Sequence, residues 1–321
     1  MLAVRPMGFL SRRTDAQETG LRTGGPLPLP YCQEGTVTQS VVPNQTTFWQ
    51  SGEPTASVAT EGTPPIAEDI PRDWYTRIFD ERYLEVDQLR KPAPTTAGEI
   101  GWLMRHVVRS KRAHILDLCC GYGRHSIRLA QHGHDVEGLD LSAPLLHAAR
   151  LKAAEADVRL TLHHCDMRDI QPSAFDVVLS MHTSFGYLPE GQDDAEVLRA
   201  VHGCLVPGGS LVLQFLDPDC AIRAGSIEER LVLKDGTQYR KVSRVVDNGE
   251  YAYWYGVYAY QSRDGSSVIY PFGIRLYKPS ALVSMATRVG FHGCTIGRST
   301  SAPDGNIPAG TLALRARKRG R

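Results

Sequence analysis

The sequence predicts an α/β protein built on a doubly wound, largely parallel sheet. Short apolar runs alternate with segments of helical period between residues 114 and 217, a pattern typical of βαβ units whose sheet is covered on both faces. A glycine-containing turn follows the first apolar run, at the place where open α/β sheets bind ligands. With 321 residues, 42% hydrophobic and 22% charged, the chain can bury a large core.

Two helical segments are expected before the first strand. Residues 69–90 repeat apolar side chains at roughly helical spacing, and a second helical pattern continues to residue 110. Thr96 and Glu99 have the spacing of a capping box, so we expect them to begin the second helix.

Five strands with helices between them are expected next, over residues 114–120, 134–141, 158–166, 175–181 and 210–217. After the fifth strand, the pairs Asp235-Gly236, Asn248-Gly249 and Asp264-Gly265 separate β-rich runs. These turn signals predict an antiparallel β insert over about residues 228–278. A helix that ends at Gly290 and two closing strands, residues 291–298 and 310–318, complete the pattern.

The first 68 residues differ in composition from the rest of the chain. They contain no lysine and eight of the 20 prolines, and no long helical or strand period. Such a segment buries too little apolar surface to offset its ordering entropy. We therefore expect a disordered leader over residues 1–68 and a single folded domain over residues 69–321.

Charge and cysteine content exclude several function classes. Lys and Arg number 36 against 35 Asp and Glu, so the chain has no overall field that would attract nucleic acid. The seven cysteines lack CxxC spacing, which argues against a disulfide framework or a structural zinc site. No apolar run approaches the roughly 18 residues that span a bilayer. We expect a cytoplasmic protein with neither nucleic-acid nor membrane partners.

A metal site is not expected either. His163, His164, Cys165 and the Cys119-Cys120 pair are potential ligands by residue type. Neighbouring residues on a strand point to opposite faces of the sheet, so these pairs do not converge on one ion.

The turn after the first strand indicates a nucleoside site. Gly121 and Gly123 let a ligand approach the backbone, and Asp140 ends the second strand, where a carboxylate accepts hydrogen bonds from ribose hydroxyls. The third glycine of the dinucleotide fingerprint is absent, since Ser126 occupies its position. Asp117 beside the turn would repel a phosphate and suit an ammonium group. The pattern predicts a cationic nucleoside that carries an amino acid.

Over about residues 72–318, the chain resembles the class I S-adenosylmethionine-dependent methyltransferases of small-molecule type. The resemblance rests on HILDLCCGYGRHSIRLA, VEGLDLS, HCDMRDI, FDVVLSMHTSFGY and LVPGGSLVLQF. It implies a seven-stranded Rossmann-like methyltransferase sheet, an N-terminal helical lid over residues 70–110, the β insert after the fifth strand, and S-adenosyl-L-methionine as cofactor.

The resemblance also assigns cofactor-binding residues. Those expected are Tyr75 and Tyr83 of the lid, Asp117, Cys119, Gly121 and Gly123 of the glycine loop, Asp140 with Leu141 for the ribose, Asp166 with Met167 for the adenine, and Met181. The sequence departs from the family pattern at Cys119, where many members have the first glycine of the loop.

His182 and Tyr187 are the expected catalytic residues, because they follow the fourth strand at the edge of the sheet where ligands bind. An imidazole suits proton abstraction from an amine or hydroxyl; a loop histidine that binds backbone is the alternative. We expect the acceptor between the lid, residues 182–187 and the insert, with Tyr251, Tyr253 and Tyr255 facing it.

The expected reaction is transfer of the methyl group to a nitrogen, oxygen or carbon of a small molecule by in-line displacement. Two alternatives stay open. One is another use of the same cofactor, such as transfer or cyclisation of its aminopropyl arm, and the other is a non-catalytic cofactor-binding protein. The sequence does not fix the acceptor, the need for a general base or the oligomeric state.

Overall fold

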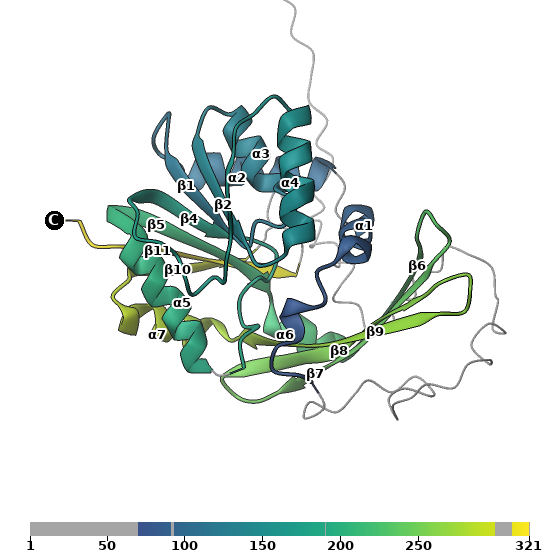
Figure 1. The fold of residues 1–321 in the computed structure, drawn as a ribbon. Coiled ribbons are helices and arrows are strands. Elements are labelled where there is room, and N and C mark those ends of the chain that lie inside the picture. The colour runs from purple at the N-terminus through teal and green to yellow at the C-terminus, as the bar shows by residue number, and fades with distance from the viewer. Residues whose placement is uncertain (1–69, 91–92, 190, 299–309, 321) are drawn as a thin grey trace, which may run out of the picture.

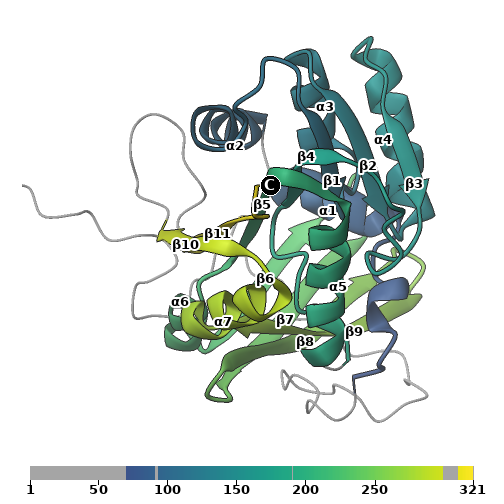
Figure 2. The ribbon, with the colours of Figure 1, turned by 90° about the vertical axis from the view of Figure 1, so that its left-hand side faces the viewer.

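The computed structural model describes residues 70–90, 93–189, 191–298 and 310–320. The leader expected over residues 1–68 lies outside the described residues. Seven strands form the main sheet in the order β10-β11-β5-β4-β1-β2-β3. Their bounds are β1 His114–Leu118, β2 Asp135–Asp140, β3 Thr161–His164, β4 Phe175–Ser180, β5 Leu205–Leu216, β10 His292–Arg298 and β11 Thr311–Arg317. Figure 2 shows β10 and β11 at one edge of the sheet and β3 at the other.

The sheet is parallel from β5 to β3, whereas β11 pairs antiparallel with both β5 and β10. Helices cover both faces (Figure 1): α2 Ala93–His106, α3 Arg124–Gln131 and α4 Ala143–Glu155 lie on one, and α5 Gly191–Cys204 and α7 Pro279–Val289 on the other. Leu103 and Leu129 pack with Val177 on the first face, while Leu198 and Leu282 pack with Leu213 on the second. The doubly wound sheet predicted from the alternating pattern is confirmed.

The antiparallel insert follows β5 by way of α6 Pro218–Ala224. It consists of β6 Ser226–Val232, β7 Gln238–Asp247, β8 Tyr251–Gln261 and β9 Ser267–Tyr277, paired in that order into a separate four-stranded sheet. The insert begins at Ser226, close to the predicted residue 228, and extends away from the main sheet (Figure 1). The turns at Asp235-Gly236, Asn248-Gly249 and Asp264-Gly265 connect its strands, as predicted.

The lid packs against the insert. Of the lid predicted over residues 70–110, the part that packs there comprises a 3₁₀ turn, η2 Trp74–Thr76, and α1 Glu81–Arg90, whereas α2 packs on the main sheet. The term lid is used below for η2 and α1. Trp74, Ile78 and Val86 share a buried cluster with Tyr258 and Phe272 of the insert. Tyr251, Tyr253 and Tyr255 of β8 were expected to face the lid and the acceptor, and this orientation is wrong. The cluster with the lid contains Trp254, Tyr258 and Tyr260 instead. Because side chains alternate along a strand, the three predicted tyrosines point to the opposite face of the insert.

The predicted capping box is wrong. Helix α2 begins at Ala93, so Thr96 lies inside the helix instead of before it. The Thr96 hydroxyl accepts a hydrogen bond from Arg124 Nη1 at 2.9 Å, and Glu99 is directed toward α3. Two residues with a capping-box spacing therefore serve a contact between helices.

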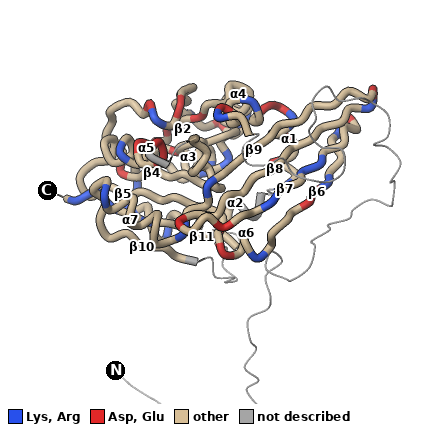
Figure 3. The backbone as a smooth tube through the Cα atoms, turned by 90° about the horizontal axis from the view of Figure 1, so that it is seen from below, with Lys and Arg blue, Asp and Glu red and all other residues tan. Residues whose placement is uncertain are grey.

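Acidic and basic residues are interspersed along the described backbone (Figure 3). Residues of both charges are thus neighbours along the chain, in keeping with its near-neutral net charge. No helix among the described residues has the length and apolar character needed to cross a membrane.

Candidate functional site

A cleft opens at the carboxyl ends of β1, β2 and β4, beneath the lid. The space between its walls is about 890 Å³, including the open mouth. Its walls contain every predicted cofactor-binding and catalytic residue except Gly123: Tyr75, Tyr83, Asp117, Cys119, Gly121, Asp140, Leu141, Asp166, Met167, Met181, His182 and Tyr187. Tyr251, Tyr253 and Tyr255, which were expected to face the acceptor, do not belong to this lining. The structure thus gathers residues from six separate segments of the chain at one place.

The glycine loop adopts left-handed backbone conformations. The φ angles are 60° at Cys119, 57° at Gly121 and 74° at Gly123. A Cβ atom on Gly123 would lie 3.2 Å from Ala149 Cβ, so this glycine allows α3 to approach α4 and does not line the cleft. Cys119 has the same left-handed φ although it carries a side chain, at the position where the resemblance expects glycine. Such backbone strain costs about 1–3 kcal/mol and is common at functional sites.

Asp140 organises this loop. Its Oδ2 accepts a hydrogen bond from the backbone N–H of Gly121, and its Oδ1 accepts one from that of Ser142, each at 2.8 Å. Burial raises the pKa of Asp140, while these two bonds oppose the rise. Each carboxylate oxygen retains a second lone pair, so Asp140 can hold the loop and still accept hydroxyl groups.

Asp117 lies deeper, at 1% exposure. Its Oδ2 accepts a hydrogen bond from the Ser126 hydroxyl at 2.5 Å, and burial raises its pKa. The serine that replaces the third glycine of the dinucleotide fingerprint therefore has a defined partner.

Asp166 lies near the opposite end of the cleft with Met167. Arg168 donates to both of its oxygens, from Nε to Oδ1 and from Nη2 to Oδ2, each at 2.9 Å. Partial burial opposes the effect of Arg168, but the hydrogen bonds outweigh it and lower the pKa of Asp166. The side chain is thus a fixed, ionised acceptor.

Aromatic rings from the lid and from the turn after β4 also line the cleft. Phe79 stacks on Tyr187 with ring centroids 5.9 Å apart and meets Tyr83 edge to face at 4.8 Å; Tyr75 also belongs to this lining. Burial raises the pKa of Tyr187 well above its ordinary value, so its hydroxyl keeps its proton at neutral pH. Rings of this kind attract cations by about 0.5–2 kcal/mol each.

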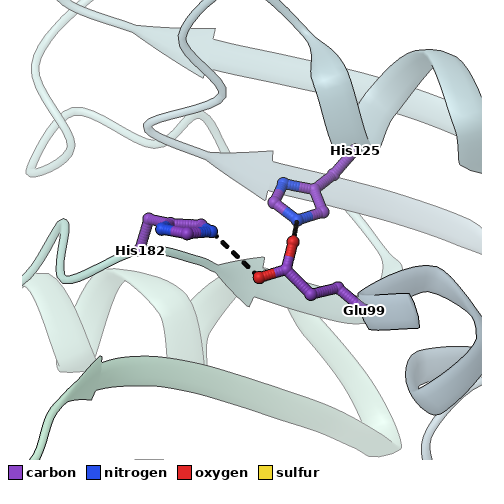
Figure 4. A group of neighbouring side chains, drawn as sticks. All are labelled: Glu99, His125 and His182. Carbon is purple, nitrogen blue, oxygen red and sulfur yellow. Dashed lines mark hydrogen bonds and ion pairs between the residues drawn. The ribbon is translucent and has the colours of Figure 1, made fainter. Parts of the chain in front are cut away.

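Arg124, His125 and His182 of the cleft wall meet in a polar cluster around Glu99, and Figure 4 shows the carboxylate with the two imidazoles. Glu99 Oε1 lies 2.9 Å from His182 Nε2, and Glu99 Oε2 lies 2.8 Å from His125 Nε2 and 2.6 Å from Arg124 Nη1. The imidazole of His182 thus binds a carboxylate, in contrast to the backbone contact of the alternative prediction. Arg124 Nη2 is buried and has no hydrogen-bond partner among the residues that the structure describes.

Sequence reasoning missed Glu99, Arg124 and His125. Arg124 and His125 directly follow the glycine loop, and this position alone could have indicated that their side chains lie at the site. Glu99 was assigned a local role because its partners lie about 25 or more residues away in sequence.

Within the described ranges, one group of potential metal ligands converges, and it is Glu99, His125 and His182, whose ligand atoms lie within 4.8 Å of one another. The pairs considered from sequence are engaged elsewhere. His163 Nε2 lies 2.6 Å from Glu137, and His164 Nε2 binds the Leu141 carbonyl at 2.9 Å.

Comparisons with known proteins agree with this geometry. Residues 115–209 match a family described as a methyltransferase domain. The cypemycin N-terminal methyltransferase of Streptomyces sp is 33% identical over 150 residues, 46% of this chain and 60% of that protein. The dTDP-3-amino-3,4,6-trideoxy-alpha-D-glucopyranose N,N-dimethyltransferase of Streptomyces venezuelae is 32% identical over 137 residues, 42% of this chain and 56% of that protein. The chain thus spans less than two thirds of these curated relatives.

Solved structures show the same fold. An S-adenosylmethionine-dependent methyltransferase from Clostridium acetobutylicum ATCC 824 superposes with a TM-score of 0.58 at 15% identity, covering 74% of this chain and 97% of that one. The sugar N-methyltransferase KedS8 from Streptoalloteichus sp ATCC 53650 gives a TM-score of 0.58 at 20% identity, covering 84% and 99%.

Proposed function

We propose that this chain, of which residues 115–209 match a methyltransferase domain, is a class I S-adenosylmethionine-dependent methyltransferase that binds S-adenosyl-L-methionine and transfers its methyl group to a small-molecule amine. The observation that carries the proposal is the cleft above the glycine loop, where carboxylates, an unpartnered guanidinium N–H and aromatic rings meet. The proposal favours nitrogen among the acceptor atoms that the sequence left open.

The polar groups of the cleft fit this cofactor. Arg124 Nη2 is a buried donor that finds no acceptor within the described part of the chain, and a carboxylate such as that of the cofactor's amino-acid part would satisfy it. Asp117 suits the neighbouring ammonium, Asp140 the ribose hydroxyls and Asp166 the adenine amino group. A pyrophosphate would meet the Asp117 and Asp140 carboxylates, so a dinucleotide fits less well.

When bound, S-adenosyl-L-methionine supplies an electrophilic methyl group on a sulfonium. The chain's own residues then have to orient the acceptor, exclude water and receive a proton. Positioning of this kind supplies up to about 7–11 kcal/mol of the barrier. Tyr187, with its proton retained, offers a hydrogen-bond donor and a ring surface to the acceptor, and His182 offers an imidazole for proton transfer.

Two observations support an amine acceptor. The relatives quoted above are named for methylation of an amino sugar and of a peptide N-terminus. In addition, the aromatic rings of Tyr75, Phe79, Tyr83 and Tyr187 line the cleft, and such rings favour cationic ligands.

The test is incubation of the protein with S-adenosyl-L-methionine and a panel of small amines, amino sugars and peptides, with mass spectrometry of all products. We expect S-adenosylhomocysteine and a methylated amine in equal amounts. His182→Gln should lose rate by about 10²–10⁴-fold if the imidazole takes the proton, whereas His147→Gln, an exposed residue of α4, should not. Methylthioadenosine as the product would replace methyl transfer by aminopropyl chemistry, and the absence of turnover with tight cofactor binding would indicate a non-catalytic protein.

A further inference from the structure

Glu99 connects the two sides of the cleft. It belongs to α2, its Oε2 faces the start of α3 directly after the glycine loop, and its Oε1 faces His182 after β4. The side chain is fully buried, at 0% exposure. A buried carboxylate needs partners for both oxygens, and Figure 4 shows one imidazole on each.

The charges of this cluster assign the imidazole protons. Burial works against ionisation of Glu99, but the hydrogen bonds from His125 and His182 outweigh it and lower the pKa of Glu99 well below its usual range. An ionised carboxylate only accepts hydrogen bonds. Both Nε2 atoms therefore carry a proton, and whenever the His182 ring is neutral its lone pair is on Nδ1.

The adjacent backbone is held in a strained shape. His182 and Thr183 both have φ of 59°, in the left-handed region, although neither is glycine. Gln214 holds this turn on both sides, because its Oε1 accepts the His182 N–H at 3.0 Å and its backbone carbonyl accepts the Thr183 N–H at 2.9 Å. Two consecutive strained residues indicate that the placement of this imidazole matters to the protein.

We propose that Glu99 is a positioning residue that holds His182 in the tautomer with Nδ1 as proton acceptor, and that Gln214 fixes the backbone that carries it. This inference rests on the proposed methyl transfer. A proton of the acceptor's N–H moves to Nδ1, its bonding electron pair stays on nitrogen, and the Glu99 carboxylate stabilises the imidazolium that results. The proton then passes to solvent.

A divalent metal ion on the same three side chains is the competing arrangement. Two imidazoles and one carboxylate are a known ligand set, but Arg124 already donates to Glu99 Oε2 at 2.6 Å. A second cation at that oxygen would be repelled by the guanidinium, and the tautomers inferred above place a proton on both Nε2 atoms, which leaves neither of them a lone pair for a metal ion. The cluster therefore favours proton transfer.

The test is long-range ¹H–¹⁵N correlation spectroscopy of the histidine rings in the full-length protein. The wild type should show His182 with its proton on Nε2. A wild-type His182 signal with the proton on Nδ1 overturns the proposal, and so does a stoichiometric divalent metal in the purified protein that a chelator removes together with activity. The tautomer readout requires no known acceptor, and calorimetric titration with S-adenosyl-L-methionine tests the proposed function separately.

Variants separate positioning from folding. Glu99→Gln should mix the His182 tautomers, lower kcat by about 10²–10⁴-fold and move the acidic limb of the pH profile to lower pH, because the imidazolium loses its carboxylate. Acceptor KM should stay unchanged. His125→Gln removes the other imidazole and should leave the His182 tautomer as in the wild type. Unchanged kcat and pH profile in a folded Glu99→Gln protein would refute the positioning role.

Discussion

Replacing Asp140 by asparagine tests how the cleft is held together. The carboxylate accepts the N–H groups of Gly121 and Ser142, each at 2.8 Å. An amide has one oxygen, so its NH₂ group would face the other N–H. Each hydrogen bond to a charged group contributes about 1.5–3 kcal/mol, and a buried donor left unpaired costs about 1–3 kcal/mol. Because burial raises the pKa of Asp140, removal of its charge recovers part of this loss.

We therefore expect Asp140→Asn to lower the free energy of unfolding by about 2–4 kcal/mol and to weaken S-adenosyl-L-methionine binding by about 10–100-fold. Urea denaturation followed by circular dichroism measures the first quantity, and titration calorimetry measures the second. Asp135→Asn is the matched control, since Asp135 begins the same strand and is exposed; its effect should stay within about 0.5 kcal/mol. Equal stability of the two variants would show that the Asp140 carboxylate does not organise the glycine loop.

Two further substitutions test other parts of the structure. Gly186→Ala should lower the free energy of unfolding, measured by chemical denaturation, far more than Gly133→Ala. Both glycines have φ near 90°, but only at Gly186 would a Cβ meet backbone, 2.1 Å from the Arg275 carbonyl oxygen. Equal losses of unfolding free energy would mean that the loop at Gly186 moves without cost. Lys241 is buried against Trp254 with its ammonium 4.1 Å from the ring centroid, and burial lowers its pKa to about 7. Between pH 7 and 10 the unfolded chain still binds a proton at Lys241 that the folded protein has lost, so the free energy of unfolding should rise with pH. The rise should exceed that of Lys241→Met by at most about 1.4 kcal/mol per pH unit. Identical pH profiles of the two proteins would contradict the depressed pKa.

Much of the fold and most of the cleft follow from local sequence signals. The alternation of apolar runs and helical periods depends on each element's own burial pattern, so it predicts the βαβ order well. Asp140 is predictable because the carboxyl ends of neighbouring parallel strands meet at one edge of the sheet. For the same reason His182 and Tyr187 were expected at the cleft, where the structure places them.

The errors arise where a local pattern is compatible with two arrangements. Thr96 and Glu99 have the spacing of a helix cap, but their partners come from α3 and from the turn after β4, which no local window contains. Strand β8 has aromatic side chains on both faces, so alternation identified the two faces without showing which one meets the lid. Tertiary contacts decided both cases.

Titration calorimetry with S-adenosyl-L-methionine, compared with NAD under the same conditions, tests the central assignment most directly. The cleft predicts one binding site per chain for S-adenosyl-L-methionine, weakened in Asp140→Asn and unaffected in Asp135→Asn, and no comparable binding of NAD. Tighter binding of NAD, or no binding of S-adenosyl-L-methionine to the folded wild type, would contradict the assignment of this cleft as a methyl-donor site.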